Sequence, residues 1–120
     1  MSGFIDRLAA ARIGATHNFY RDGARAPLLL ERLEGYLGER AGAPILLVAE
    51  APGYRGTRIS GIPLTSERQL TGTGPAEATA TIVHRVLAAL GLEDGVLLWN
   101  VVPTHPGRRA QPSARAWKRL

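Results

Sequence analysis

Two polar residues stand beside apolar runs of the sequence, where their side chains could act on a bound ligand. Glu50 directly follows the run 45–49, and Asn100 lies inside the run 96–102. An amide offers donors and an acceptor that can match the edge of a pyrimidine base. A carboxylate can orient a water molecule or stabilise a developing cation. The alternatives are that Asn100 only fixes a neighbouring loop and that Glu50 only caps a helix or braces a loop.

The segment 50–74 carries further candidates, because it is rich in Gly, Pro, Thr and Ser and is long for a loop inside a compact domain. Loops of that length are usually functional. Pro52 stiffens the chain, and Gly53 permits a positive φ or the close approach of a ligand. Arg55 and Arg58 could bind phosphates, or could equally be solvated. Residues 71–74 lead into a helix N-terminus that could bind an anion, although a flexible connector explains them as well.

The histidines give a weaker signal. We expect His84 to be solvated on the polar side of its helix and His17 to make a local hydrogen bond before a turn. His105 follows the second apolar run and could donate to a substrate, but a loop histidine without a function is the simpler interpretation. The sequence contains neither a Ser-His-Asp order nor a cluster with metal-ligand spacing. We therefore predict no metal and no cofactor.

The elements that must position these residues follow from the spacing of apolar side chains. That spacing predicts helices over 3–12, 27–40 and 75–90. The core face expected for the last helix comprises Ile82, Val83, Val86, Leu87 and Leu90. The runs 45–49 and 96–102 do not alternate, which is typical of strands buried on both faces in a parallel sheet. Strand, helix, strand is a βαβ unit, and ligands bind beyond the carboxyl ends of such strands. Glu50 and Asn100 should therefore share one edge of the sheet, with Trp99 facing the opposite side of its strand as core.

Composition narrows the class of protein. The 120 residues suffice for one domain, and the absence of cysteine excludes disulfides, thiolate zinc sites and cysteine-held iron–sulfur clusters within the chain. The net charge of +5 lies wholly in 108–120, a basic tail without acidic residues. Such a tail could bind phosphate backbones, or could simply be solvated. No apolar run is long enough to span a membrane and no signal sequence is evident, so we expect a cytoplasmic protein. A domain over 1–107 followed by the tail is the expected organisation.

Two segments resemble motifs of the uracil-DNA glycosylase superfamily. Residues 47–53, followed by Gly61-Ile62-Pro63-Leu64, resemble its first motif in the form G-E-A-P-G with a later G-x-P-F, and residues 97–103 resemble the strand that carries its base-reading asparagine. The resemblance covers roughly 16–107. It implies a three-layer α/β/α fold with a short parallel sheet. It also implies a monomeric base-excision-repair enzyme that hydrolyses the N-glycosidic bond of uracil flipped out of DNA.

The same resemblance implies a role for each motif residue. Asn100 would hydrogen-bond the pyrimidine edge, and Glu50 would position water for attack on the anomeric carbon of the sugar. Leu64 would stack on the base, and Arg55 and Arg58 would contact DNA phosphates. The base pocket would be lined by Ala51, Pro52 and Gly53. Residues 18–20 look like an Asn-x-Tyr segment found upstream in some members.

The sequence also departs from the family pattern. Ala49 replaces the first glycine of the motif, and Leu64 replaces an aromatic residue whose stacking contributes about 1–3 kcal/mol per base. The second motif, a His-Pro-Ser-like loop that stabilises the leaving uracil, is not found, since His105-Pro106 lies too early, and only two of the family's four strands are evident. We therefore expect an N-terminal part of the fold, with 108–120 either native or frameshifted, and with an exposed sheet edge prone to aggregation. The alternatives are a non-catalytic nucleic-acid-binding module, an inactive relic, or a nucleotide-binding α/β domain of another kind.

Overall fold

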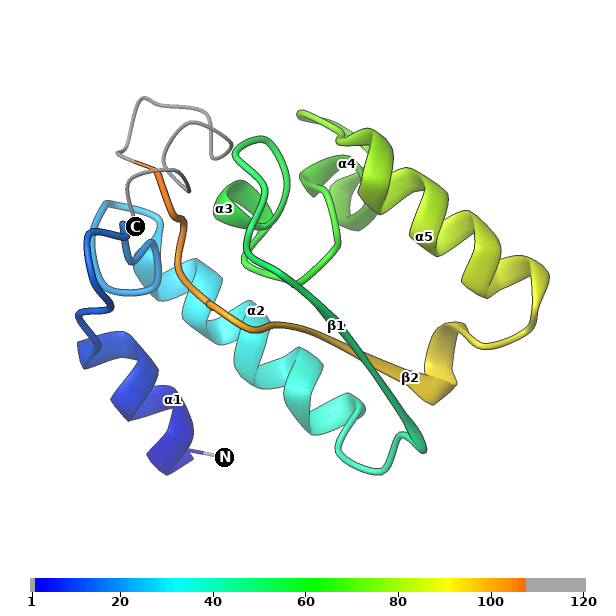
Figure 1. Cartoon of the computed structure of the whole chain (residues 1–120), viewed down its shortest axis with the longest axis horizontal. Coiled ribbons are helices and arrows are strands. Elements are labelled where there is room, and N and C mark those ends of the chain that lie inside the picture. Colours follow the sequence, from blue (N-terminus) through cyan, green and yellow to red (C-terminus); the bar gives the residue numbers. More distant parts are fainter. Residues whose placement is uncertain (1, 108–120) are drawn as a thin grey trace.

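The computed structural model describes residues 2–107, and the basic tail 108–120 lies outside them. Figure 1 shows a small α/β fold in which helices surround two strands. The elements in chain order are α1 Ser2–Ala10, α2 Ala26–Glu39, β1 Ile45–Ala49, α3 Thr57–Ser60, α4 Glu67–Thr71, α5 Ala78–Ala89, the 3₁₀ turn η1 Glu93–Gly95 and β2 Val96–Asn100.

The two strands run parallel, as the βαβ pattern predicts. Ile45 pairs with Val96 at the start of the sheet and Ala49 pairs with Asn100 at its end. Two further backbone hydrogen bonds continue the pairing past the strands, from Val101 N to the oxygen of Ala49 at 2.9 Å and from Val102 N to that of Glu50 at 3.1 Å. Glu50 and Asn100 therefore lie at the same edge of the sheet.

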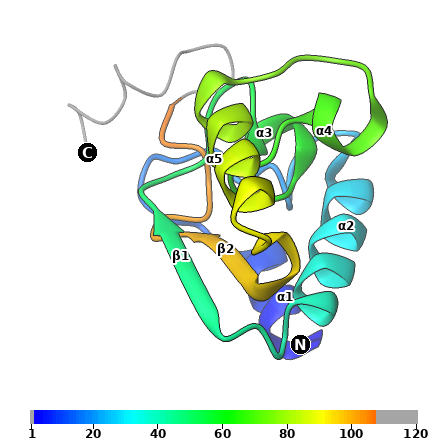
Figure 2. The same cartoon turned by 90° about the vertical axis from the view of Figure 1, so that its right-hand side faces the viewer.

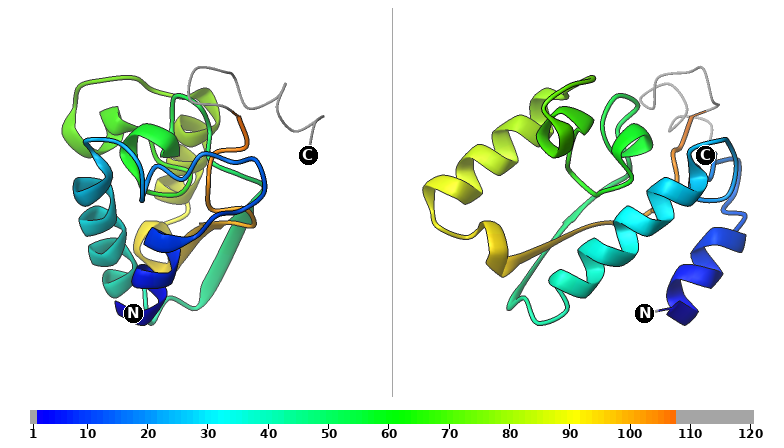
Figure 3. Two further views of the ribbon diagram at one scale, coloured as in Figure 1. Left: turned by 90° about the vertical axis from the view of Figure 1, so that its left-hand side faces the viewer. Right: turned by 180° about the vertical axis from the view of Figure 1, so that it is seen from behind.

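The main core lies between α1, α2 and one face of β2. Its buried side chains are Ile5, Leu8, Phe19, Tyr20, Leu29, Leu33 and Leu37. Trp99 packs against this core from β2, with its ring centroid 5.6 Å from that of Phe4, so it faces away from Asn100 as predicted. Figure 3 shows α1 and α2 together on this side of the strands.

A second, smaller core forms on the other face of β2. Leu87 of α5 packs there with Val96 and Leu98, and Tyr36 of α2 and Leu64 lie against them. The phenolic oxygen of Tyr36 accepts a 2.7 Å hydrogen bond from Leu98 N. Helices thus cover both faces of β2, in which buried residues alternate with half-buried ones.

Two predictions about burial are wrong. The strand 45–49 is not buried on both faces, because its side chains from Ile45 to Val48 are exposed. The expected core face of the helix 75–90 is also largely uncovered, with Ile82, Val86 and Leu90 exposed and Leu87 buried. Within residues 2–107 both core clusters pack on β2 and include no residue of β1, which leaves the side chains of β1 and much of α5 without apolar neighbours.

The long loop is more ordered than its composition indicates. It contains α3 and α4, and the predicted helix 75–90 begins three residues late, at Ala78. The Nδ2 of Asn18 donates to the backbone oxygens of Leu8 and Ala11, and the hydroxyl of Tyr20 donates to the oxygen of Gly61 at 2.6 Å. The segment 16–20 thereby connects α1 to the loop. None of the helices in the described part of the chain is long and apolar enough to cross a membrane.

Candidate functional site

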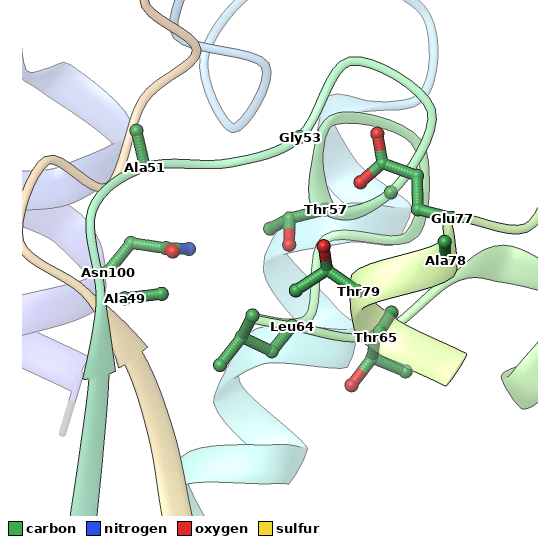
Figure 4. Close-up of a pocket in the computed structure, with 12 residues that line it drawn as sticks. Ala49, Ala51, Gly53, Thr57, Leu64, Thr65, Glu77, Ala78, Thr79 and Asn100 are labelled. Atoms are coloured by element: carbon green, nitrogen blue, oxygen red, sulfur yellow. The ribbon is translucent and has the colours of Figure 1, made fainter. Parts of the chain in front are cut away.

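A cavity of about 380 Å³ opens beyond the carboxyl ends of the two strands. That volume lies within the roughly 300–1,000 Å³ common for small-molecule sites. The lining residues come from the strand ends, the loop 51–65 and the start of α5, and Figure 4 shows them around one hollow. They are Ala49, Ala51, Gly53, Gly56, Thr57, Leu64, Thr65, Glu77, Ala78, Thr79, Ala80 and Asn100.

Asn100 is the most informative side chain in this cavity. It is 2% exposed, and its Oδ1 is a buried atom with no hydrogen-bond partner within residues 2–107. Figure 4 shows the amide directed from the end of β2 toward the hollow. A buried acceptor without a partner costs about 1–3 kcal/mol. The carbonyl oxygen of Asn100 therefore does not fix a neighbouring loop, and a ligand in the cavity could satisfy it.

The first-motif residues divide into two groups. Ala51, Gly53 and Leu64 line the cavity together with Asn100. Glu50 and Pro52 do not, since Glu50 is exposed and Pro52 is fully buried. Their assignments to water positioning and base binding stay predictions.

Pro52 supports the loop from behind the cavity. Its carbonyl oxygen lies 3.3 Å from Nδ1 of His105, a side chain that is completely buried. The backbones of His17 and His105 bond to each other in both directions, at 2.8 and 3.0 Å. The backbone bridge made by His17 is non-local, and the buried His105 packs against the loop, while a local hydrogen bond of His17 and a substrate contact of His105 stay predictions.

Glu77 is the carboxylate that sequence reasoning missed. It lies one residue before α5 and lines the cavity opposite Asn100 (Figure 4). Its Oε2 accepts a 3.1 Å hydrogen bond from the backbone N–H of Arg55, and its own backbone N–H donates to Oγ of Ser66 at 2.9 Å. The acidic residue of this cavity therefore comes from the helix start and not from the strand end.

The two arginines of the loop differ in their availability. Arg55 is exposed. Arg58 is half-buried, with its Nε donating to the oxygen of Tyr54 at 2.7 Å and its guanidinium 4.1 Å from the centre of the Tyr54 ring. Neither lines the cavity. Contact of either with DNA phosphates stays a prediction, and Arg55 has the freer side chain.

The sequence predicted a solvated His84, but the structure gives this side chain two polar contacts. Its Nε2 lies 2.9 Å from Oγ1 of Thr65 and its Nδ1 lies 3.0 Å from Oε1 of Glu93. Thr65 is a buried residue of the cavity wall. The histidine thus connects α5 and η1 to the loop that carries Leu64.

An ion pair fixes the outer side of the same loop. The guanidinium of Arg32 in α2 makes two hydrogen bonds to the Glu67 carboxylate, at 2.7 and 3.1 Å, and Arg25 adds a third at 3.2 Å. Hydrogen bonding from Arg32 holds the pKa of Glu67 below its usual range. The positions of Leu64 and Thr65 in the cavity wall therefore depend on α2 as well as on α5.

No family model matches the chain, and neither a curated protein nor a solved structure does. No group of three or more potential metal-binding side chains occurs in the part of the chain that the structure describes. The inference of function therefore starts from the residues of the cavity.

Proposed function

We propose that the cavity binds a uracil flipped out of DNA, and that the protein is a uracil-DNA glycosylase-like enzyme that hydrolyses the N-glycosidic bond. The proposal includes a fold related to the three-layer α/β/α fold of that superfamily. One observation carries it: the unpaired, buried Oδ1 of Asn100 in a cavity whose wall includes Ala51, Gly53 and Leu64.

The chemistry of the amide suits uracil. Uracil presents an N3–H donor beside the O4 acceptor, and an asparagine presents a carbonyl acceptor beside an NH₂ donor. Oδ1 of Asn100 would accept from N3–H while the NH₂ group donates to O4. Cytosine presents an acceptor at N3 and a donor at N4, so the same amide orientation would leave both pairs mismatched.

The remaining wall explains how a base would fit. Ala49 and Ala51 are small, which leaves room beside the amide, and Leu64 offers an apolar surface for the face of the base. Arg55, exposed on the same loop, would contact a phosphate of the flipped nucleotide. An enzyme must extrude its target base from the duplex, and a half-apolar pocket with one amide is the type of site that receives it.

Release of uracil tests the proposal directly. The full-length protein is incubated with an oligonucleotide that contains one uracil, and the abasic site is detected by alkaline cleavage. We expect cleavage at the uracil position and none in a matched cytosine oligonucleotide. In Asn100→Ala the loss of the amide should slow release at least about 10-fold, the equivalent of one or more hydrogen bonds to the base.

The control is Val101→Ala. Val101 follows Asn100 directly but is 70% exposed and outside the cavity, and its backbone hydrogen bond to Ala49 survives the change. Equal release by Asn100→Ala and by the control would contradict the role of the amide. Binding without release, with an affinity that falls steeply with salt, would instead favour a non-catalytic nucleic-acid-binding module.

A further inference from the structure

The carboxylate of Glu77 occupies a place in the loop that is shaped around it. A Cβ built at Gly53 would overlap the carboxylate group, and a Cβ built at Gly56 would contact Oε1 closely. Neither glycine has a positive φ, although Gly56 has a ψ of −108°, outside the regions common for residues with a side chain. The two glycines therefore make room for the carboxylate.

The two oxygens of this carboxylate have different surroundings. Oε2 accepts the hydrogen bond from the backbone N–H of Arg55, which orients the group. Oε1 has no hydrogen-bond partner within residues 2–107 and lies against Gly53, a residue of the cavity wall. One oxygen is thus anchored, and the other is left for a ligand or a water molecule.

Glu77 and Asn100 lie on opposite sides of the same cavity (Figure 4). A base held by the amide at the strand end would direct its glycosidic bond and sugar toward the rest of the cavity, where the carboxylate lies. Glu50 lies at the same edge of the sheet as Asn100, but its side chain is exposed and does not line the cavity. The amide proposed to bind the base and the carboxylate inside the cavity therefore belong to residues 23 positions apart in the sequence, Asn100 and Glu77.

We propose that Glu77, rather than Glu50, is the carboxylate that activates water in the reaction, an assignment that rests on the proposed function. Water attacks C1′ of the deoxyribose, and Glu77 accepts the proton that the water loses. The C1′–N1 bond breaks, and its electron pair leaves with uracil, whose N1 anion takes up a proton from solvent. The products are uracil and DNA with an abasic site.

The purely structural alternative is that Glu77 only braces the loop, and Glu77→Gln separates the two. Glutamine has the same length and keeps an oxygen that can accept from Arg55 N–H, but it cannot take a proton from water. In single-turnover assays of the full chain we expect Glu77→Gln to release uracil about 10²-fold more slowly or worse. Its affinity for the uracil oligonucleotide, measured by fluorescence anisotropy, and its melting temperature should equal those of the unmodified protein.

Glu34→Gln is the matched control, because Glu34 is exposed on α2 and does not line the cavity, and it should leave the rate unchanged. An unmodified rate in Glu77→Gln would overturn the assignment and establish a bracing role. Loss of release in Glu50→Gln but not in Glu77→Gln would overturn it in favour of the strand-end carboxylate. If the unmodified protein releases no uracil, the proposed hydrolysis fails and the assignment fails with it, a result seen before any variant is compared.

Discussion

Gly53 shows how one missing methyl group can matter to a site. A Cβ there would occupy the space of the Glu77 carboxylate, which is itself bonded to the backbone of Arg55. The loop and the helix start therefore meet at positions without a side chain, Gly53 and Gly56.

Gly53→Ala should displace the carboxylate and reduce uracil release, with little change in the free energy of unfolding because the displaced group is the end of a flexible side chain. Gly35→Ala is the control: it lies in α2 with open space around its Cβ position, and it should stabilise the fold by about 0.5–1 kcal/mol through its helix propensity. Urea unfolding and the oligonucleotide assay measure the two effects. If Gly53→Ala matches Gly35→Ala in both unfolding and uracil release, the Glu77 carboxylate can move aside without affecting the site.

The positions of Asn100, Ala51 and Gly53 could be predicted from sequence, because residues after parallel strands meet at one sheet edge. The direction of a side chain just past a strand could not, because it depends on how the chain turns there. Glu50 points outward for that reason. Glu77 could not be assigned to the site from sequence, since its contact with residues 53–56 depends on the path of the whole intervening loop.

At the scale of elements, α4 is held to α2 by the ion pair of Glu67 with Arg32. Both side chains are largely buried, which reduces screening by solvent. Because the pKa of Glu67 is lower in the folded state, the pair contributes stability above the ordinary glutamate pKa, and that contribution is lost as the pH falls below about 4.3 and through the folded value.

Glu67→Gln should therefore lower the free energy of unfolding by about 1.5–3 kcal/mol at neutral pH, with a smaller difference from the unmodified protein in acid. Urea unfolding curves at the two pH values measure this. The exposed Glu34→Gln should show neither effect. A constant difference across the pH range would mean that the charge of Glu67 is not the cause.

The three longer helices and both strands follow from apolar spacing to within a few residues at each end. The short helices α3 and α4 do not, since four or five residues cannot show a helical period. One signal for α4 was present: Ser66 and Gln69 form a capping box, in which the Gln69 side chain accepts from Ser66 N at 2.8 Å. The burial of β1 could not be predicted either, because it depends on which elements pack beside the strand, and the residues of the strand alone do not determine that.

At the scale of the whole molecule, large apolar side chains are exposed on both β1 and α5 in the described part of the chain. Figure 2 shows β1 at the edge of the fold, and Leu46 on that strand is 62% exposed, with Ile82 and Val86 exposed on α5. An open strand edge with apolar side chains favours pairing between molecules. We expect the described part of the chain to aggregate through this surface as concentration rises.

Leu46→Lys should reduce that self-association with little change in folding stability, because the side chain is largely in water already. Sedimentation velocity over a range of concentrations measures it. Ala10→Lys adds the same charge at an exposed position on α1, away from the strand, and should leave the association unchanged. Equal effects of the two lysines would point to net charge rather than the strand edge.

Leu64 is the one non-glycine residue with a positive φ, 50°, among residues 2–107. A left-handed backbone at a leucine costs about 1–2 kcal/mol, a cost that glycine would avoid. The fold thus gives up stability to keep a side chain at this bend in the cavity wall. The side chain kept there packs against the smaller core and lines the cavity as well, so one strained backbone position links the packing of β2 to the shape of the hollow.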